Sequence, residues 1–369
     1  MAIPRLCDDI LFRIIEFSDM DTVSSLKKVP GFRHLIQTFE TSIVKNIHRM
    51  STMAALSEER FPFVLKYDLT ALKKASADQI KAAKKSGRQD YPQAKPTLAG
   101  MNTFVAVEEL QRREHDVEVL LRAPSLLIKT SLDGIPHSWP ALPNTNSRSL
   151  LQALLKRAMT RCDVLVDIEG RAMSEVDETS FWYIGIPEGP QMMRWLTSCY
   201  TLKYQEEYLR SLPLDSLIEL YFLGTYLAEC RHKKTCKPTM DLNYFKEEHV
   251  FQEAVLRHGS WAMFNEFRGS GGRAKHDREI RDQIREGMAL RPNEDPTRAE
   301  VWHLDGLRTA LHHMLLGRLG GEHIREIGWL RAEVYKLVGA MIEAPEAFEN
   351  PPSLEGRPDD TQGVNSEWF

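Results

Sequence analysis

The sequence predicts a mainly α-helical protein, in which a short trihelical module is followed by an irregular helical domain. Apolar residues recur mostly at spacings of three and four, which is the period of an amphipathic helix. Long runs that alternate β-branched and polar residues are scarce. The chain has no internal repeat of about 20 to 50 residues, so solenoids and propellers have no support.

Composition places the chain in the ordinary range of globular proteins. Its 369 residues include 48 Lys and Arg against 52 Asp and Glu, for a formal net charge of -4. This balance argues against a surface built as a whole to neutralise phosphates or anionic lipid. A chain of this length buries roughly three quarters of its unfolded surface, so it needs neither disulfides nor a metal to form a core. We therefore expect no nucleic-acid partner and no membrane partner.

The start of the chain and the cysteines predict an intracellular protein, cytoplasmic or nuclear or both. Asp8 and Asp9 stand where a secretory signal would have cationic and apolar residues, and no stretch approaches the roughly 18 apolar residues of a membrane helix. Lys73–Lys74 and Lys84–Arg88 fit a two-part nuclear import pattern, and a solvated basic helix end is the alternative. The five scattered cysteines suit free thiols: Cys7, Cys162, Cys199, Cys230 and Cys236.

The first three predicted helices form the N-terminal module. The first covers residues 8–17, where Asp8 and Asp9 oppose the positive end of the helix dipole. The second covers 22–28 and places Val23 and Leu26 on one face. The third, over 31–48, follows Pro30–Gly31. Its apolar residues keep the helical period: Phe32, Leu35, Ile36, Phe39, Ile43 and Ile47. Three helices this short are expected to share one small core.

This segment resembles the F-box, a small helical module with an opening Leu-Pro, an acid, two apolar pairs and a second-helix core. The positions that match it are Leu6, Asp9, Ile10–Leu11, Ile14–Ile15, Asp19, Val23, Leu26 and Val29. Cys7 occupies the place of the family's proline, and Phe32 stands about one position before its tryptophan. The pattern covers about one eighth of the chain.

The resemblance implies a non-enzymatic substrate receptor that joins a client protein to a cullin-RING ubiquitin ligase. The partner would be the adaptor protein of that ligase, bound through the apolar N-terminal helices, and the client stays unidentified. The residues expected to bind the adaptor are Leu6, Asp9, Ile10, Leu11, Ile14, Ile15, Val23 and Leu26. The alternative is a helical ligand-binding or catalytic protein whose N-terminal module is purely structural.

Beyond the module, prolines and glycines divide a series of further helices. We expect the module at 1–50, a helical connector at 51–143, a helical C-terminal domain at 144–343 and a disordered acidic, proline-rich tail at 344–369, with the firmest break at Pro136, Pro140 and Pro143. The segments 162–168 and 181–186 are short enough to be a strand pair or helix. The expected helices cover 52–60, 69–85, 102–121, 147–162, 190–210, 214–231, 242–267, 274–288, 297–318 and 321–342.

The ionisable side chains show no pattern that favours a metal, a cofactor or catalysis, and we expect none. Two Glu-x-x-His pairs, Glu229/His232 and Glu300/His303, lack the further glutamates of a di-iron bundle. Cys230, His232 and Cys236 lack the second ligand pair of a structural zinc site. The aromatic residues of the middle third predict the core of the C-terminal domain, with a ligand pocket as the alternative. They are Trp182, Trp195, Tyr200, Tyr204, Tyr208, Tyr221, Phe222 and Tyr226.

Overall fold

The mainly α-helical class is confirmed over the part of the chain that the structure describes. The computed structural model describes residues 8–16, 18, 20–50, 63–64, 98–99, 103–122, 145–175, 190–235, 242–267, 306–320 and 328–343. Several expected features lie outside these residues: the helices at 52–60, 69–85 and 274–288, the segment 181–186, the basic pattern from Lys73 to Arg88, and the tail. No helix within the described ranges is both long and apolar enough to cross a membrane.

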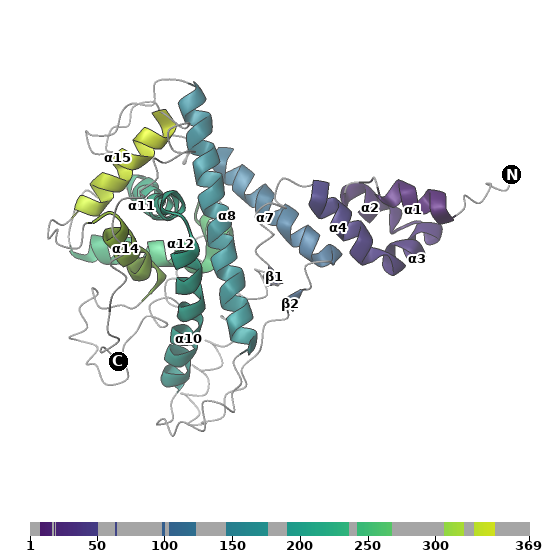
Figure 1. Cartoon of the computed structure of the whole chain (residues 1–369), viewed down its shortest axis with the longest axis horizontal. Helices are drawn as coiled ribbons and strands as arrows, with labels where there is room; N and C mark the ends of the chain where they lie inside the picture. Colours follow the sequence, from purple (N-terminus) through teal and green to yellow (C-terminus); the bar gives the residue numbers. More distant parts are fainter. Residues whose placement is uncertain are drawn as a thin grey trace, which may run out of the picture.

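The N-terminal module lies at one end of the molecule (Figure 1). It consists of α1 (Asp8–Glu16), α2 (Met20–Leu26), α3 (Pro30–Thr38) and α4 (Glu40–Met50). Each helix is too short to be stable alone, so their shared core must stabilise them. The buried side chains of that core are Ile15, Met20, Val23, Leu35, Ile36, Ile43 and Val44.

The single third helix expected over 31–48 is wrong, because the chain breaks at Phe39. This residue has φ -108° and ψ 18° and separates α3 from α4. Just before it, the Thr38 hydroxyl donates a hydrogen bond to the carbonyl of His34 at 2.9 Å, a bond that competes with the helix and bends it. The apolar period survives because only one residue leaves the helix. The module therefore has four short helices.

Helix α7 (Phe104–Arg122) completes the core of the module from outside the first fifty residues. Phe104 and Val107 are buried among its apolar side chains, and the Lys27 ammonium lies 3.8 Å from the centre of the Phe104 ring. The Glu40 carboxylate accepts a hydrogen bond from the Phe104 backbone N–H at 2.7 Å. The first turn of α7 is thus part of the module.

We expect Glu40→Ala to lower the free energy of unfolding by about 1 kcal/mol, because it removes an acceptor from the first turn of α7. Urea unfolding gives the energy, and faster amide exchange of Phe104 locates the change. The control is Glu108→Ala, since Glu108 is exposed on the same helix turn. Equal losses in the two variants would contradict the capping role.

The helical body is built around the long helix α8 (Thr145–Glu175), seen at its centre in Figure 1. It contacts α7, α10 (Pro190–Ser211), α11 (Leu214–Thr235), α12 (Leu242–Phe267) and α15 (Trp329–Glu343). Helix α14 (Leu307–Arg318) packs on α10, α11 and α12. Two short antiparallel strands, β1 (Phe63–Val64) and β2 (Leu98–Ala99), lie near α8.

The strand alternative for residues 162–168 is wrong, because α8 runs through the whole segment. Neighbouring helices cover α8 on several sides, so six of these seven residues are buried. A helix that is buried nearly all round has no clear amphipathic period, and its sequence then looks like a buried strand. Cys162 within it is a free thiol, as is Cys230 on α11.

The aromatic residues of the middle third do form core where the structure describes them. Tyr208, Tyr221, Phe222 and Tyr226 are buried in one large cluster, and Tyr204 packs against it. Phe222 stacks on Tyr226 with ring centres 5.5 Å apart and meets the edge of Tyr335 at 5.2 Å. The side chains of Trp182, Trp195 and Tyr200 lie outside the described part.

The expected helix 297–318 matches the structure only from Leu307, where α14 begins, since Gly306 is not helical and residues 297–305 lie outside the described part. Gly306 before it is extended, with φ -154°, and the buried Glu253 carboxylate of α12 accepts the backbone N–H of Leu307 at 3.1 Å and of Arg308 at 2.8 Å. A carboxylate at this place satisfies two N–H groups that a helix start leaves open. A long-range cap of this kind has no local sequence signal.

Candidate functional site

The eight residues expected to bind a partner fall into three groups. Ile10 and Ile14 are exposed on α1, Leu11 and Leu26 are half-buried against the module core, and Ile15 and Val23 are fully buried. Leu6 lies outside the described residues, and Asp9 is placed in α1 without its side chain being described. Only Ile10 and Ile14 of the six described side chains are thus offered openly to solvent.

Ile10 and Ile14 form an apolar pair on the outer face of α1. They are 48% and 41% exposed, and their spacing of four places them one above the other on the helix. Ile15, the next residue along the chain and about 100° farther around the helix, points into the core and is 0% exposed. Helix α1 therefore turns one apolar face to its own core and keeps two large aliphatic side chains on a neighbouring face that is open to solvent.

The core holds the backbone of α1 in place behind this pair. Ile15 is buried among Met20, Val23 and Ile36, and α1 packs on α3 and α4. At the end of α1 the Ser18 hydroxyl donates a hydrogen bond to the Ile14 carbonyl at 2.6 Å. The positions of Ile10 and Ile14 are thus fixed before any partner arrives, which reduces the entropy lost on binding.

Two other large apolar side chains of the module are exposed at turns. Val29, 46% exposed, precedes α3, and Phe39, 40% exposed, separates α3 from α4. Scattered exposed apolar residues are normal on a protein surface. The pair on α1 differs because two branched side chains are adjacent on one helix face.

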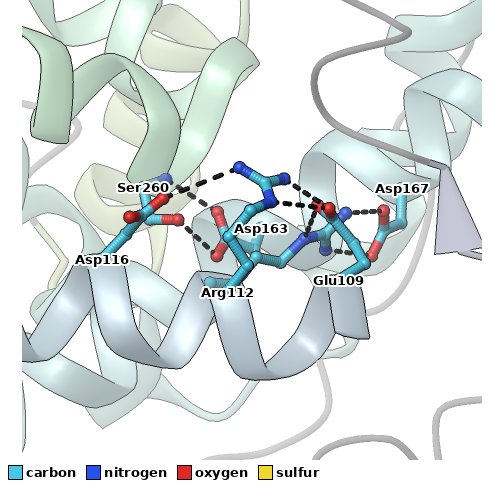
Figure 2. Close-up of polar contacts among 7 residues, drawn as sticks. Glu109, Arg112, Asp116, Asp163, Asp167 and Ser260 are labelled. Atoms are coloured by element: carbon cyan, nitrogen blue, oxygen red, sulfur yellow. Dashed lines mark hydrogen bonds and ion pairs between the residues drawn. The ribbon is translucent and has the colours of Figure 1, made fainter. Parts of the chain in front are cut away.

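A buried ion-pair network fixes α7, and with it the module, to the helical body (Figure 2). Arg113 of α7 forms two parallel hydrogen bonds to Asp167 of α8, from Nη1 at 2.7 Å and from Nη2 at 2.8 Å. Its Nε also donates to Glu109 at 2.8 Å. The side chains of all three residues are at most 5% exposed. Paired, bidentate geometry is what a buried guanidinium needs to offset its lost hydration.

Burial and charge act in opposite directions on this network. Burial raises the pKa of Glu109, but the guanidinium groups of Arg113 and Arg112 more than offset that effect, so its pKa lies below the usual value. Burial lowers the pKa of Arg113, and the nearby carboxylates, Asp167 first, raise it by more. Both side chains are therefore charged at neutral pH.

The same network continues to α12 through Asp163 of α8 (Figure 2). Asp163 accepts the Ser260 backbone N–H at 2.7 Å and the Ser260 hydroxyl at 2.8 Å. Arg112 bridges Glu109 and Asp116 along α7. The carboxylates in the network thus receive cations or helix N–H groups, which is the arrangement of a structural joint and not that of a free acid or base.

The metal sites considered from the sequence find no support among the described residues. No group of three His, Cys, Asp or Glu in that part of the chain could hold a metal ion. The Glu229 carboxylate contacts Arg331 and accepts the Tyr335 hydroxyl at 2.9 Å. The side chains of His232, Cys236, Glu300 and His303 lie outside the described part.

No protein-family model, curated protein or solved structure matches the chain. The candidate site therefore rests on the geometry of its own residues.

The buried network was missed by the sequence analysis. Its residues on α7 are charged and closely spaced, a pattern that usually indicates a solvated helix face. The available signal was that Asp116 and Arg113 share the helix with Val117 and Leu120, which are buried at spacings of one to seven residues from them. Recognising this signal requires knowing that the face of α7 with Arg113 and Asp116 packs against α8 and α12.

Proposed function

We propose that this protein is a non-enzymatic interaction protein that binds the adaptor of a cullin-RING ubiquitin ligase through α1 of its N-terminal module. The single observation that carries the proposal is the exposed pair Ile10 and Ile14 on a helix whose residues Leu11 and Ile15 pack in the module core. The resemblance of residues 6–29 to the F-box supplies the identity of the partner. The helical body would carry the client.

The contact would work by burial of aliphatic surface on an ordered helix. Each fully buried isoleucine side chain contributes roughly 1.5 to 3 kcal/mol relative to its exposed state. A helix of the partner that covers both side chains would also exclude water from the face between them. Ile15 and Val23 would contribute indirectly, because they hold α1 in place from inside the module.

The attachment of the module suits a receptor that presents a client at a fixed place. The first turn of α7 lies in the module core, and Arg113 farther along the same helix is bound to α8 of the body. One continuous helix therefore spans the two parts. A client bound to the body would keep a constant orientation to α1.

The test is a pull-down of purified ligase adaptor with the full chain. We expect Ile10→Asp/Ile14→Asp to weaken capture by at least tenfold, because it places two hydrated carboxylates in an interface that must lose its water. Both positions are exposed, so the free energy of unfolding should change by less than about 1 kcal/mol.

The matched control is Val105→Asp/Val119→Asp, which makes the same chemical change at two exposed positions of α7, 47% and 37% accessible. This control should capture as much adaptor as the unmodified chain. Equal capture by both double variants, or no capture by the unmodified chain, would refute the proposal and leave the module with a structural role.

A further inference from the structure

Four helices of the body bring an unusual set of side chains together away from the N-terminal module. Arg308 and His312 come from α14 and His249 and Gln252 from α12, while Tyr221 comes from α11 and packs its ring 6.0 Å from that of His312. Helix α15 adds Arg331 nearby, which affects the pKa of Tyr221. These residues are distant in the sequence, and only the fold assembles them.

Arg308 differs in its partners from five other arginines on α7, α8, α12 and α15, each of which pairs with a carboxylate. Arg157 and Arg161 pair with Glu219, Arg257 pairs with Glu253, and Arg331 pairs with Glu229 and Glu248. Arg113 pairs with Asp167. Arg308 has no carboxylate partner among the described residues: its Nε donates to Gln252 Oε1 at 2.9 Å, and its Nη1 lies 3.4 Å from His249 Nδ1.

The carboxylates closest to Arg308 are already engaged elsewhere. Glu248 pairs with Arg331 and accepts the Gln252 amide at 2.9 Å, and Glu253 caps α14 and pairs with Arg257. Burial lowers the pKa of Arg308 despite the charges of these groups. The neighbouring carboxylates therefore do not fully offset the free-energy cost of burying the Arg308 guanidinium.

The orientation of Arg308 is nevertheless fixed. The Glu248 carboxylate holds the amide of Gln252, and the oxygen of that amide holds Arg308 Nε. With Nε on Gln252 and one Nη1 proton toward His249, the guanidinium keeps Nη2 and the second Nη1 proton for another acceptor.

The two histidines add neutral hydrogen-bonding groups beside the guanidinium. Burial first, and then Arg308 and His312, lower the pKa of His249 to about 3. Burial, Arg308 and His313 lower the pKa of His312 to about 4. Both rings are uncharged at neutral pH, and His312 Nδ1 is buried without a hydrogen-bond partner in the described part of the chain. Each neutral ring can donate one hydrogen bond.

We propose that Arg308, His249 and His312 form a binding site for an oxyanion group, a phosphoryl or a carboxylate, at the junction of α11, α12 and α14. The guanidinium supplies the charge and two parallel donors, a geometry that both anions accept. A cation would be repelled, and an apolar group would leave the charge of Arg308 uncompensated and His312 Nδ1 without a hydrogen bond. The inference concerns the helical body alone and does not depend on the adaptor surface of α1.

The test is isothermal titration of the full chain with inorganic phosphate and, separately, acetate, with chloride used to keep the ionic strength constant. We expect saturable binding of at least one anion at one site per chain. The ratio of the two affinities identifies the group as phosphoryl or carboxylate. Absence of saturable binding for both anions would overturn the proposal.

Variants locate the site. Arg308→Gln should weaken binding at least tenfold, because charge-assisted hydrogen bonds are lost. Arg210→Gln is the control, since Arg210 is exposed on α10 and pairs with Glu206. If Arg308→Gln does not fold, Arg308→Lys replaces it, because lysine keeps the charge without the planar guanidinium. Arg308→Lys should bind the anion at least about threefold more weakly than the unmodified chain. Unchanged affinity in both Arg308 variants would overturn the proposal.

The NMR signals of the histidine rings provide a second measurement, which a change in stability alone would not affect. Phosphate or acetate should shift the ring signals of His249 and His312, and leave those of the exposed His34 and His115 in place. Ile10→Asp/Ile14→Asp should bind the anion as well as the unmodified chain does. The two proposals can therefore fail independently.

Discussion

Arg113→Met is expected to lower the free energy of unfolding by about 3 to 5 kcal/mol, because it leaves the buried carboxylates of Asp167 and Glu109 without their main partner. Methionine has a similar length and would fill most of the space. The penalty would therefore come from uncompensated charge and not from a cavity. The shift of the midpoint in urea unfolding measures it.

The control for this variant is Arg122→Met on the same helix. Arg122 also pairs with a glutamate four residues earlier, Glu118, but the two side chains are 80% and 44% exposed. Exposed pairs of this kind contribute about 0.3 to 0.5 kcal/mol. A loss in Arg113→Met no larger than that in Arg122→Met would show that the network does not stabilise the junction of α7 and α8.

The pH dependence separates uncompensated charge from poor packing. In the unmodified chain the lowered pKa of Glu109 stabilises the fold above about pH 4.5, and this contribution is lost as the pH falls through the lower folded pKa. Without Arg113, burial would act with less opposition and raise that pKa. Glu109 of the variant would then take up a proton at a higher pH than it does in the unmodified chain. The loss of unfolding free energy in Arg113→Met should therefore be smaller at about pH 5 than at about pH 7.5. A loss caused by poor packing would be the same at both pH values.

A double variant tests whether the ion pair itself is needed for stability. Arg113→Met/Asp167→Leu replaces both charged partners by apolar side chains, and such replacements are often neutral or stabilising. We expect it to recover more than half of the loss seen in Arg113→Met, with Glu109 still paired to Arg112. Asp167→Leu alone is measured for comparison. If the double variant loses as much stability as Arg113→Met and Asp167→Leu lose together, the two residues do not act together.

The sequence was informative where local apolar periodicity determines the structure. The helix expected at 242–267 has the observed bounds of α12, and 190–210 differs from α10 by one residue. In the N-terminal module, Ile15 and Val23, which the sequence analysis counted among the adaptor-binding residues, lie in the core. What periodicity could not separate was the part of the N-terminal apolar stripe that is buried from the part that stays exposed. Ile10 and Ile14 have the same residue type and spacing as core positions.

Ion pairs show more clearly what local sequence patterns could not predict. Glu109–Arg113 and Glu118–Arg122 are both glutamate–arginine pairs at a spacing of four on α7. Only the first is buried, because its partner Asp167 comes from α8, 54 residues later. Likewise, the start of α14 depends on Glu253 and the orientation of Arg308 depends on Gln252, each more than fifty residues earlier in the chain. Such contacts between distant residues leave no local signal.

Gly259→Ala is the second variant with a large expected effect. Gly259 interrupts α12 with φ 56° and ψ -146°, a conformation that is essentially confined to glycine. A Cβ at this position would lie 2.1 Å from Asp163 Oδ1 and 3.3 Å from its Cα. The Asp163 carboxylate would have to move, although it holds the backbone N–H and the hydroxyl of Ser260. Alanine therefore adds backbone strain and breaks the connection between α8 and α12.

We expect Gly259→Ala to lower the free energy of unfolding by about 3 kcal/mol or more, the sum of the strain and of a buried carboxylate that loses its donors. Gly320→Ala is the matched control, because Gly320 also has a positive φ, 68°, but nothing lies within 4 Å of its would-be Cβ. It should show the strain alone, about 1 to 2 kcal/mol. If the two variants lose the same stability, the close approach of Asp163 to α12 does not contribute to it. A larger loss in Gly259→Ala, together with faster amide exchange at Ser260, would locate the difference at that contact.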